Sequence, residues 1–237
     1  MISVIIPTYN EAALIESALD SLRAVRGDFE VVVADGSSTD GTALRVESLA
    51  PGFPRRIRVS VTERNRGKQL NCAAGLATGH VLLFLHADAR LPEDALESLE
   101  CALTQESVVG GNFHLRFEGG GWSRFFTWVD RTRRAFGIYY GDSGLFVRRT
   151  MFERLGGFKP IPLMEDYEFI RRLDRLTRRE RLKTVCLPRA ISVSDRRWRA
   201  QGVWRTMWTW FWIQSLYSVG VSPSRLARWY RPVRLGR

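Results

Sequence analysis

ISVIIPTYNE, residues 2–11, is an apolar run that ends in a polar cluster. The same pattern returns as EVVVADGSS at residues 30–38 and as VLLFLHADA at residues 81–89. Each apolar run is nearly uniform, which indicates strands whose two faces are both covered by helices. Amphipathic stretches separate the runs. This alternation of strand and helix is typical of βα units and predicts an α/β fold around a parallel sheet.

The expected elements extend this pattern over most of the chain. Strands are predicted at residues 2–6, 30–34, 57–62, 81–85, 108–117, 144–148 and 184–187. Helices are predicted at residues 11–24, 41–50, 67–77, 96–104, 165–178 and 201–219. We divide the chain into a regular first half, residues 1–105, a less regular second half, residues 106–195, and a C-terminal helical segment, residues 196–237.

The composition is that of a globular protein. Of the 237 residues, 45% are hydrophobic and 26% are charged, which excludes a disordered, collagen-like or disulfide-scaffold protein. The three cysteines show no CxxC spacing, so neither a disulfide framework nor a thiolate metal site is indicated. This cysteine usage fits a reducing cytosol, and the N-terminus lacks a signal-peptide pattern. We therefore expect a cytoplasmic protein.

The net charge of +11 is unevenly distributed along the chain. Residues 1–170 carry 19 basic and 22 acidic side chains, a net −3, whereas residues 171–237 carry 17 and 3, a net +14. The basic character therefore belongs to the C-terminal part, and nucleic acid is not indicated as a partner.

The C-terminal part also holds a group of large aromatic side chains in an uncharged stretch between Arg205 and Arg225. They are Trp208, Trp210, Phe211, Trp212 and Tyr217. The stretch at 206–224 carries too many polar residues for a good transmembrane span. Two interpretations stay open: the segment rests on the inner face of a membrane as a peripheral anchor, or it packs its aromatic side chains against the sheet or a second copy.

Polar side chains follow the first two predicted strands, at the edge where open α/β sheets bind ligands. Tyr9 can lie beside an aromatic base, while main-chain groups around Thr8 read the edge of that base. The alternative is a plain turn in which Pro7 ends the strand and Asn10 caps the next helix. Asp35 directly follows the second strand and can accept a hydrogen bond from a base imide or a ribose hydroxyl.

Two further aspartates lie after strands. Asp40 is expected to cap the second helix and to be structural. His86 and Asp88 are two residues apart after the fourth strand, so an extended chain would aim both to one side. An aspartate there can bind a hard divalent cation that bridges diphosphate oxygens. A helix cap or a solvated turn residue is the alternative for Asp88.

Glu165 and Asp166 open a predicted helix behind the apolar pair Leu163-Met164. Acidic residues in a first helical turn are stabilised by the helix dipole, which alone could explain the pair. The apolar residues before them favour a carboxylate turned into a cleft. A partly desolvated carboxylate beside a like charge has a raised pKa and suits general-base catalysis.

Taken together, several motifs resemble the nucleotide-diphospho-sugar glycosyltransferases of family 2, which have the GT-A fold. The resemblance covers about residues 1–185. It implies a mixed, mainly parallel sheet flanked by helices, with a sugar-nucleotide half at 1–105 and an acceptor and catalytic half at 106–195. The motifs that carry it are residues 3–11, 33–42, 64–71, 141–149, 156–158 and 165–166.

The resemblance also implies a role for individual residues. Tyr9 and Asp35 hold the donor's base, and the surroundings of base and ribose are formed by Pro7, Thr8, Glu11 and Lys68. His86-Ala87-Asp88 stands where the family usually has Asp-x-Asp, as in a bacterial subgroup with His-Ala-Asp. Asp88 is then the ligand of Mn²⁺ or Mg²⁺. Asp166 is the general base with Glu165 as its neighbour, and Asp142 lines the acceptor side.

The implied activity is an inverting, hexosyltransferase-type transfer from a nucleoside-diphosphate sugar, with UDP preferred, to an acceptor hydroxyl. A lipid-linked or other membrane-associated molecule is one option for the acceptor. A catalytically silent sugar-nucleotide-binding or membrane-adaptor protein is the alternative. A nucleotidyltransferase fits less well, because the loop after the first strand has no glycine.

Overall fold

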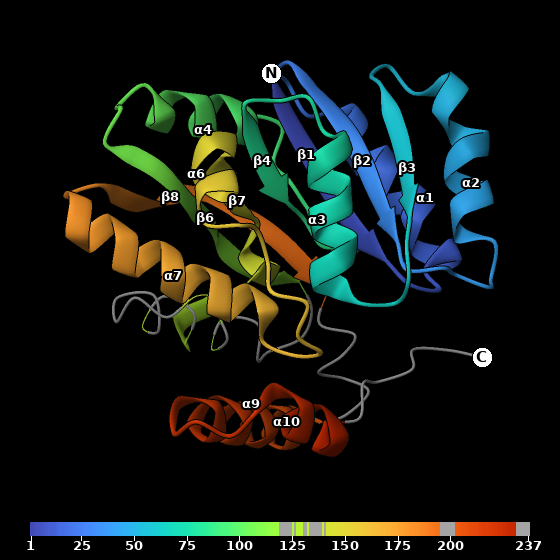
Figure 1. The fold of residues 1–237 in the computed structure, drawn as a ribbon. Coiled ribbons are helices and arrows are strands. Elements are labelled where there is room, and N and C mark those ends of the chain that lie inside the picture. The colour runs from blue at the N-terminus through green and yellow to red at the C-terminus, as the bar shows by residue number, and fades with distance from the viewer. Residues whose placement is uncertain are drawn as a thin grey trace.

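The computed structural model describes residues 1–118, 125, 127–129, 132, 139, 141–194 and 202–230. Its centre is an eight-stranded sheet with the order β3-β2-β1-β4-β7-β6-β8-β5 (Figure 1). Four of the strand pairs are parallel and three are antiparallel. The sheet is therefore mixed and mostly parallel, as the sequence predicts.

The first half of the chain forms the parallel part of the sheet. Its strands are β1 (Ile2–Thr8), β2 (Phe29–Asp35), β3 (Ile57–Val61) and β4 (Val81–Phe84), and its helices are α1 (Ala12–Arg23), α2 (Thr42–Leu49), with the short turn η1 (Ala50–Gly52), and α3 (Arg66–Leu76). The expectation that Pro7 ends the first strand is wrong: β1 runs on to Thr8 and pairs Pro7 with Ala34. Pairing with β4 stops at Ile5, so Pro7 has only one strand neighbour.

The first half ends with β5 (Ala89–Arg90) and α4 (Ala95–Leu103). The second half contains β6 (Val108–Glu118), η2 (Gly141–Ser143), β7 (Leu145–Arg148), α6 (Arg149–Arg154), α7 (Glu165–Glu180) and β8 (Lys183–Ser194). Its strands take part in all three antiparallel pairs and form the parallel pair β6–β8. β8 is much longer than the predicted strand at 184–187, because Pro188 and Arg189 are bypassed by a register shift opposite Phe113 and His114. Proline is tolerated at such an irregularity, where no ladder hydrogen bond is required of it.

Both faces of the sheet are buried, which explains the uniform apolar strands. Alternate residues of one strand enter opposite layers: Val4 packs with α1, α2 and α4, whereas Ile5 packs with α3, α6 and α7. The two helical layers lie on opposite sides of the sheet in Figure 1.

A third helical layer lies apart from the sheet, below α7 in Figure 1. It consists of α9 (Val203–Ser218) and α10 (Pro223–Trp229), which pack side by side. Its inner side joins the start of α7 through a buried cluster of Met164, Tyr167, Ile213 and Leu226. Among the helices that the structure describes, none has the length and apolar character to cross a bilayer.

Candidate active site

The loops after β1 and β2 are bound to each other by Asp35. Its buried carboxylate accepts hydrogen bonds from the Thr8 hydroxyl at 3.0 Å, the Ser38 amide at 2.8 Å and the Ser38 hydroxyl at 2.6 Å. The Thr8 carbonyl accepts from the amide of Gly36 at 2.9 Å. The carboxylate is thus fixed at the carboxyl edge of the sheet, where the sequence places it.

Two more side chains cross between these loops. The Asn10 side-chain oxygen accepts from the Thr39 amide at 2.9 Å, so the expectation that Asn10 caps α1 is wrong. That task falls to the second loop, since Asp40 accepts from the Ala12 amide at 2.9 Å and from the Thr42 amide at 3.0 Å. The N-cap position of α2 is occupied by Gly41 and not by Asp40, so that prediction is wrong, but the Asp40 side chain binds the first amide of both α1 and α2.

Gln69 on α3 supports the same edge from behind. Its buried side-chain amide donates to the carbonyls of Thr8 at 2.8 Å and Ala34 at 2.9 Å, which joins the ends of β1 and β2. Gln69 is not among the residues predicted for the site. In the sequence it is only a polar residue on the inward side of a helix that follows a strand.

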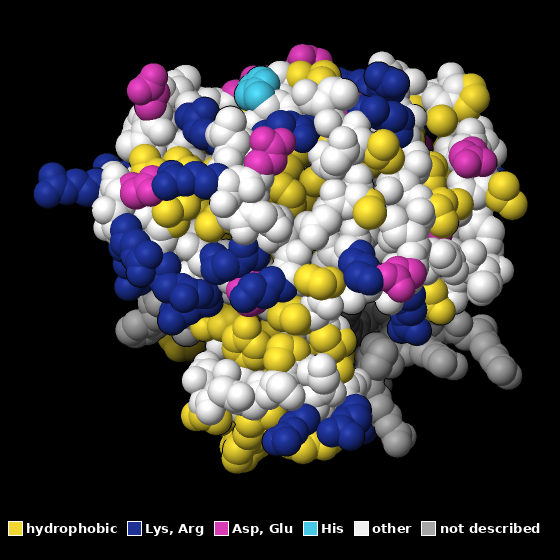
Figure 2. Space-filling model, in the orientation of Figure 1, with side chains coloured by type: hydrophobic (Ala, Val, Ile, Leu, Met, Phe, Trp, Pro, Cys, Tyr) yellow, Lys and Arg dark blue, Asp and Glu magenta, His cyan; other side chains and the backbone are white. Residues whose placement is uncertain are grey.

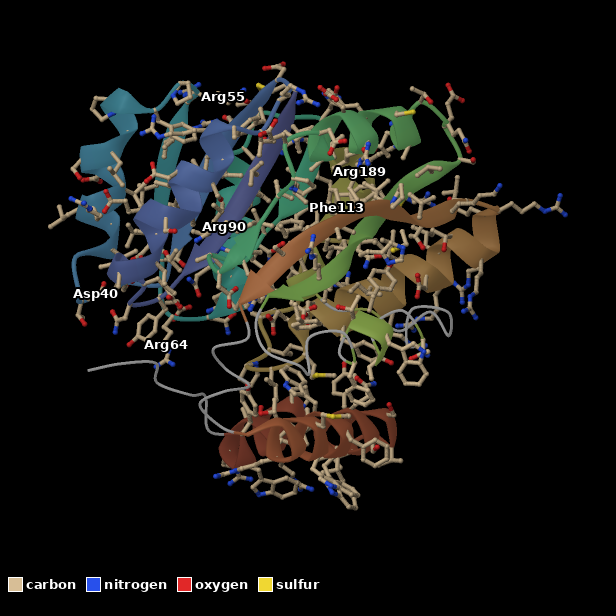
Figure 3. The ribbon with its side chains drawn as sticks, turned by 180° about the vertical axis from the view of Figure 1, so that it is seen from behind. Asp40, Arg55, Arg64, Arg90, Phe113 and Arg189 are labelled. Carbon is tan, nitrogen blue, oxygen red and sulfur yellow. The ribbon has the colours of Figure 1, made fainter. Side chains whose placement is uncertain are left out.

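The ring of Tyr9, which is predicted to bind the donor's base, lies at this edge of the sheet. Arg64 covers one of its faces. Tyr9 keeps 36% of its surface accessible, and the Arg64 guanidinium carbon lies 4.0 Å from the ring centroid. Figure 3 shows Arg64 and Asp40 at the same edge of the sheet, which faces the α9–α10 layer. Lys68, predicted to lie near base and ribose, is paired with Glu63.

The segment His86-Ala87-Asp88 is a turn, closed by a hydrogen bond from the Ala89 amide to the His86 carbonyl at 3.1 Å. The extended conformation assumed from the sequence is therefore wrong, and the two side chains are not related by strand alternation. His86 contacts the guanidinium of Arg66 at the start of α3. Asp88 is partly exposed after β4.

Arg66 also reaches the second half of the site. Its Nε lies 3.1 Å from Oε1 of Glu165, at the first turn of α7. One guanidinium therefore contacts both the turn after β4 and the acidic pair, although residues 86 and 165 are far apart in sequence. Arg66 was not among the predicted site residues, because an arginine at a helix start carries no such signal by itself.

The two acidic residues have different environments. Glu165 is buried, and this burial, together with the neighbouring charge of Asp166, raises the pKa of Glu165 to about 7, against a smaller lowering by Arg66. The Asp166 carboxylate accepts a hydrogen bond from the Gly141 amide at 2.7 Å on Oδ2 and from the Tyr167 amide at 2.7 Å on Oδ1. A Cβ at position 141 would lie 2.9 Å from Oδ2, so glycine permits this close approach.

The start of α7 is set by its tertiary neighbours. Met164 precedes Glu165 with φ of 68° and is buried in the cluster with Ile213 and Leu226. A left-handed conformation is unfavourable for a side chain of this size and persists where packing fixes it. On the other flank, the Lys159 carbonyl approaches α3 so closely that a Cβ on Gly67 would lie 2.4 Å from it.

The remaining predicted residues belong to the same strand ends, turns and helix starts. Thr8 is buried, Pro7 is half-buried in β1, Glu11 precedes α1, Ala87 is buried in the turn after β4, and Asp142 is half-buried in η2 next to Gly141. The structure thus brings the β1, β2 and β4 loops and the acidic pair to one region. The roles of these residues in binding and catalysis stay predictions.

Asp88 fits a cation that is shared with a substrate. Within the described ranges, no three His, Cys, Asp or Glu side chains are grouped as a ready-made metal site. Mg²⁺ is commonly held by only one or two carboxylates together with substrate phosphates and waters, and the partly exposed carboxylate of Asp88, in the turn between β4 and β5, could be one of them. His86 is turned to Arg66 instead.

Comparisons with known proteins identify the family. The sequence profile of Glycosyl transferase family 2 matches residues 3–155. A PGL/p-HBAD biosynthesis glycosyltransferase of Mycobacterium bovis is 33% identical over 176 residues, which are 71% of this chain and 68% of that protein.

Solved structures share the fold. A mannosyltransferase of Pyrobaculum calidifontis, in complex with GDP-Man and Mn²⁺, is 25% identical with a TM-score of 0.71 over 96% of this chain and 68% of its own. TarS 1–349 of S. aureus, in complex with UDP, gives a TM-score of 0.64 at 21% identity, over 81% of this chain and 60% of its own. The expected GT-A architecture is confirmed, and the chain belongs to glycosyl transferase family 2.

Proposed function

We propose that this family 2 member is an inverting glycosyltransferase of the hexosyltransferase type. It transfers a sugar from a nucleoside-diphosphate donor, with UDP preferred, to an acceptor hydroxyl. One observation carries the proposal: Arg66 contacts both His86, in the turn after β4, and Glu165, so this turn and the acidic pair lie on either side of one guanidinium. We assign residues 1–105 to the donor half and residues 106–195 to the acceptor half.

The donor's base is proposed to lie at Tyr9 and Asp35. Tyr9 supplies an aromatic ring, whose face Arg64 covers in this structure, and Asp35 supplies a carboxylate that is already fixed by three hydrogen bonds. Such preorganised groups lose little freedom when a ligand binds. Pro7, Thr8, Glu11 and Lys68 surround base and ribose in this assignment. GDP-Man and UDP are the nucleotides bound by the two structural relatives, which supports a nucleoside-diphosphate donor.

Asp166 is proposed as the general base. It takes the proton of the acceptor hydroxyl while the hydroxyl oxygen attacks the anomeric carbon, and the bond from that carbon to the diphosphate oxygen breaks. This single displacement inverts the anomeric configuration and needs no covalent enzyme intermediate. The two amide donors keep the Asp166 carboxylate in place for the proton. Glu165 shares the site as its buried neighbour, and Asp142 lines the acceptor side.

Asp88 is proposed to hold Mn²⁺ or Mg²⁺ together with the donor's diphosphate. When bound, the cation would offset the negative charge of the departing nucleoside diphosphate. The Mn²⁺ in the Pyrobaculum calidifontis complex supports this assignment. We also propose that His86-Ala87-Asp88 marks a bacterial subgroup of the family, in which a histidine replaces the first aspartate of Asp-x-Asp.

The acceptor is proposed to be lipid-linked, with the protein in the cytoplasm and peripheral on the inner face of the membrane. The support is the basic and aromatic C-terminal layer, which packs against the residues next to the acidic pair. The lipid-linked acceptor would then meet the carboxylates of Glu165 and Asp166 at the membrane surface.

Donor-hydrolysis assays with purified protein test the function, with water in place of the acceptor hydroxyl. UDP-glucose, UDP-N-acetylglucosamine and GDP-mannose are incubated with Mn²⁺ and release of the nucleoside diphosphate is measured. Thermal shift with UDP and GDP, with and without Mn²⁺, reports binding separately, since a ligand that binds only the folded state raises the melting temperature. Binding without any donor turnover would favour the silent adaptor. Turnover that persists in Asp88→Ala and in excess chelator would remove the cation from the proposal.

A further inference from the structure

We infer that the outer face of the α9–α10 layer docks this protein on an anionic lipid bilayer. The face, here called the aromatic face, consists of Trp208, Phe211, Trp212 and Trp229 with Arg205, Arg225 and Arg228. The inference rests on the proposed function in one respect, because it adds the surface on which a lipid-linked acceptor would be met.

The aromatic side chains of this face are unusually exposed. The exposed fractions are 58% for Trp208, 60% for Phe211, 55% for Trp212 and 66% for Trp229. In α9 they follow the spacing i, i+3 and i+4, which places them on one side of the helix. The opposite side of α9 is buried at Thr206 and Ile213. One side of α9 is therefore packed against the protein, and a second, apolar side faces solvent.

The rings of α9 already form a cluster. Trp208 stacks on Trp212 with centroids 6.5 Å apart, and it meets Phe211 edge to face at 6.0 Å. Contiguous exposed apolar surface of this kind marks an interaction site on a soluble protein. Tryptophan combines a large apolar ring with an N–H donor and favours the headgroup region of a bilayer.

The charges on the layer select an anionic partner. Residues 202–230 contain no Asp or Glu, and the three arginines of the aromatic face are exposed. Hydrophobic and basic side chains gather on the lower edge of the molecule in Figure 2, and Figure 3 shows side chains of this layer projecting away from the sheet. Basic residues near an anionic bilayer add attraction to the burial of aromatic rings.

The same charges disfavour a second copy as the occupant. A two-fold dimer would place the aromatic face against itself, so that arginines would approach arginines with no acidic residue on either face. An anionic bilayer is complementary to all three arginines at once.

The inner side of the layer connects docking to the site. Ile213 and Leu226 pack on Met164 and Tyr167, which flank Glu165 and Asp166 in sequence. One helix with its side chains is about 10–12 Å thick. A protein docked by the aromatic face would therefore hold the acidic pair roughly one helix diameter from the lipid surface. That separation suits an acceptor hydroxyl carried on a polar lipid headgroup.

Vesicle sedimentation tests the inference with the full chain. The vesicles are pure phosphatidylcholine or phosphatidylcholine mixed with about one third phosphatidylglycerol, so that only the second kind carries a negative surface potential. We expect binding to the anionic vesicles at low salt, weaker binding at high salt, and at least about a tenfold lower partition coefficient for Trp208→Ala/Trp212→Ala. Leu44→Ala is the matched control, because Leu44 is 71% exposed on α2, away from this layer.

Three outcomes would overturn the inference. They are no binding to anionic vesicles at low salt, equal binding by the double variant, or a wild-type dimer that the double variant converts to a monomer in sedimentation velocity. The last result would assign the aromatic face to a second copy. UDP binding by thermal shift is measured on the same samples. Vesicle binding without UDP binding would contradict the proposed donor and support docking. UDP binding without vesicle binding would support the donor and overturn docking.

Discussion

The loops after β1 and β2 and the first turn of α7 meet at the candidate site, and they are held in different ways. The loops are fixed by polar contacts among themselves, with Asp35, Asn10 and Asp40 each bonded to the neighbouring loop or helix start. The turn of α7 is fixed by apolar packing at Met164 and by one arginine, Arg66, on Glu165. The proposed donor side is therefore a polar frame joined by hydrogen bonds, and the proposed acceptor side is an acidic pair placed against a hydrophobic layer.

This difference predicts where substitutions separate binding from catalysis. A change in the α7 turn should alter proton transfer with little effect on nucleotide binding. A change in the polar frame should alter nucleotide binding first.

Asp166→Asn should retain the fold and UDP binding and lose most transfer activity. The amide has nearly the shape of the carboxylate but cannot accept the acceptor's proton, and removal of a general base commonly lowers the rate about 10²–10⁴-fold. Transfer is measured at saturating donor, and UDP affinity is measured by calorimetry. Glu165→Gln is the matched control in the neighbouring position. If Glu165→Gln abolishes transfer and Asp166→Asn does not, the roles within the pair are reversed.

The polar frame was largely predictable from the sequence, because its residues lie in contiguous motifs directly after strands. Asp35 and Asp40 could be placed at the sheet edge from the apolar runs before them. The contacts of Asn10 could not be predicted, because its hydrogen bond with the Thr39 amide depends on how two loops approach each other in space.

The acceptor side was predictable only in its residue types. Glu165 and Asp166 stood out as an acidic pair, but Arg66 lies about a hundred residues earlier and its contact arises from the packing of α3 beside α7. The turn at His86 was missed for a related reason: strand alternation holds only while the chain remains extended, and β4 ends at Phe84. Packing of distant elements decides such details, and local pattern does not contain them.

The stability of the protein should depend on pH through Glu165, at the start of α7. The pKa of Glu165, about 7 in the folded protein against 4.5 as its ordinary value, means that the folded state binds this proton more tightly than the unfolded chain. The free energy of unfolding should therefore fall as pH rises from about 4.5 to about 7 and level off above that range. The expected loss at this group is on the order of 2–3 kcal/mol.

Urea unfolding of wild type and Glu165→Gln at pH 5 and pH 8 measures this effect. Groups that do not interact with Glu165 titrate equally in both proteins, so the difference between the two pH dependences reports Glu165 together with its interactions with Asp166 and Arg66. Wild type should lose stability relative to Glu165→Gln as pH rises. Parallel pH dependences would show that Glu165 is not held in an unfavourable charged state, and the apolar description of the α7 turn would be wrong.

Asp35→Ala should weaken UDP binding by about 1–3 kcal/mol, the cost of a lost hydrogen bond whose partner stays unpaired. The same change leaves Thr8 and Ser38 without their acceptor, so the frame itself should also loosen. Ser38→Ala separates the two effects, because it removes one donor to the carboxylate and keeps the carboxylate. Calorimetry with UDP on variants shown to be folded by circular dichroism gives the comparison. Equal affinities for wild type and Asp35→Ala would place the base elsewhere.

The smallest expected effect concerns the ring of Tyr9, whose face Arg64 covers with its guanidinium carbon 4.0 Å from the ring centroid. In the proposed function the donor's base lies on this ring, so the guanidinium has to give way before the base can stack. A cation–π contact at an exposed site contributes about 0.5–1 kcal/mol. We therefore expect Arg64→Ala to tighten UDP binding by about two- to fivefold, measured by calorimetry. Arg64→Lys retains the charge but loses the planar group, so it should fall between wild type and Arg64→Ala. Weaker UDP binding by Arg64→Ala would instead make the guanidinium a donor contact, and the polar frame would then extend beyond Tyr9 to the segment that leads into α3.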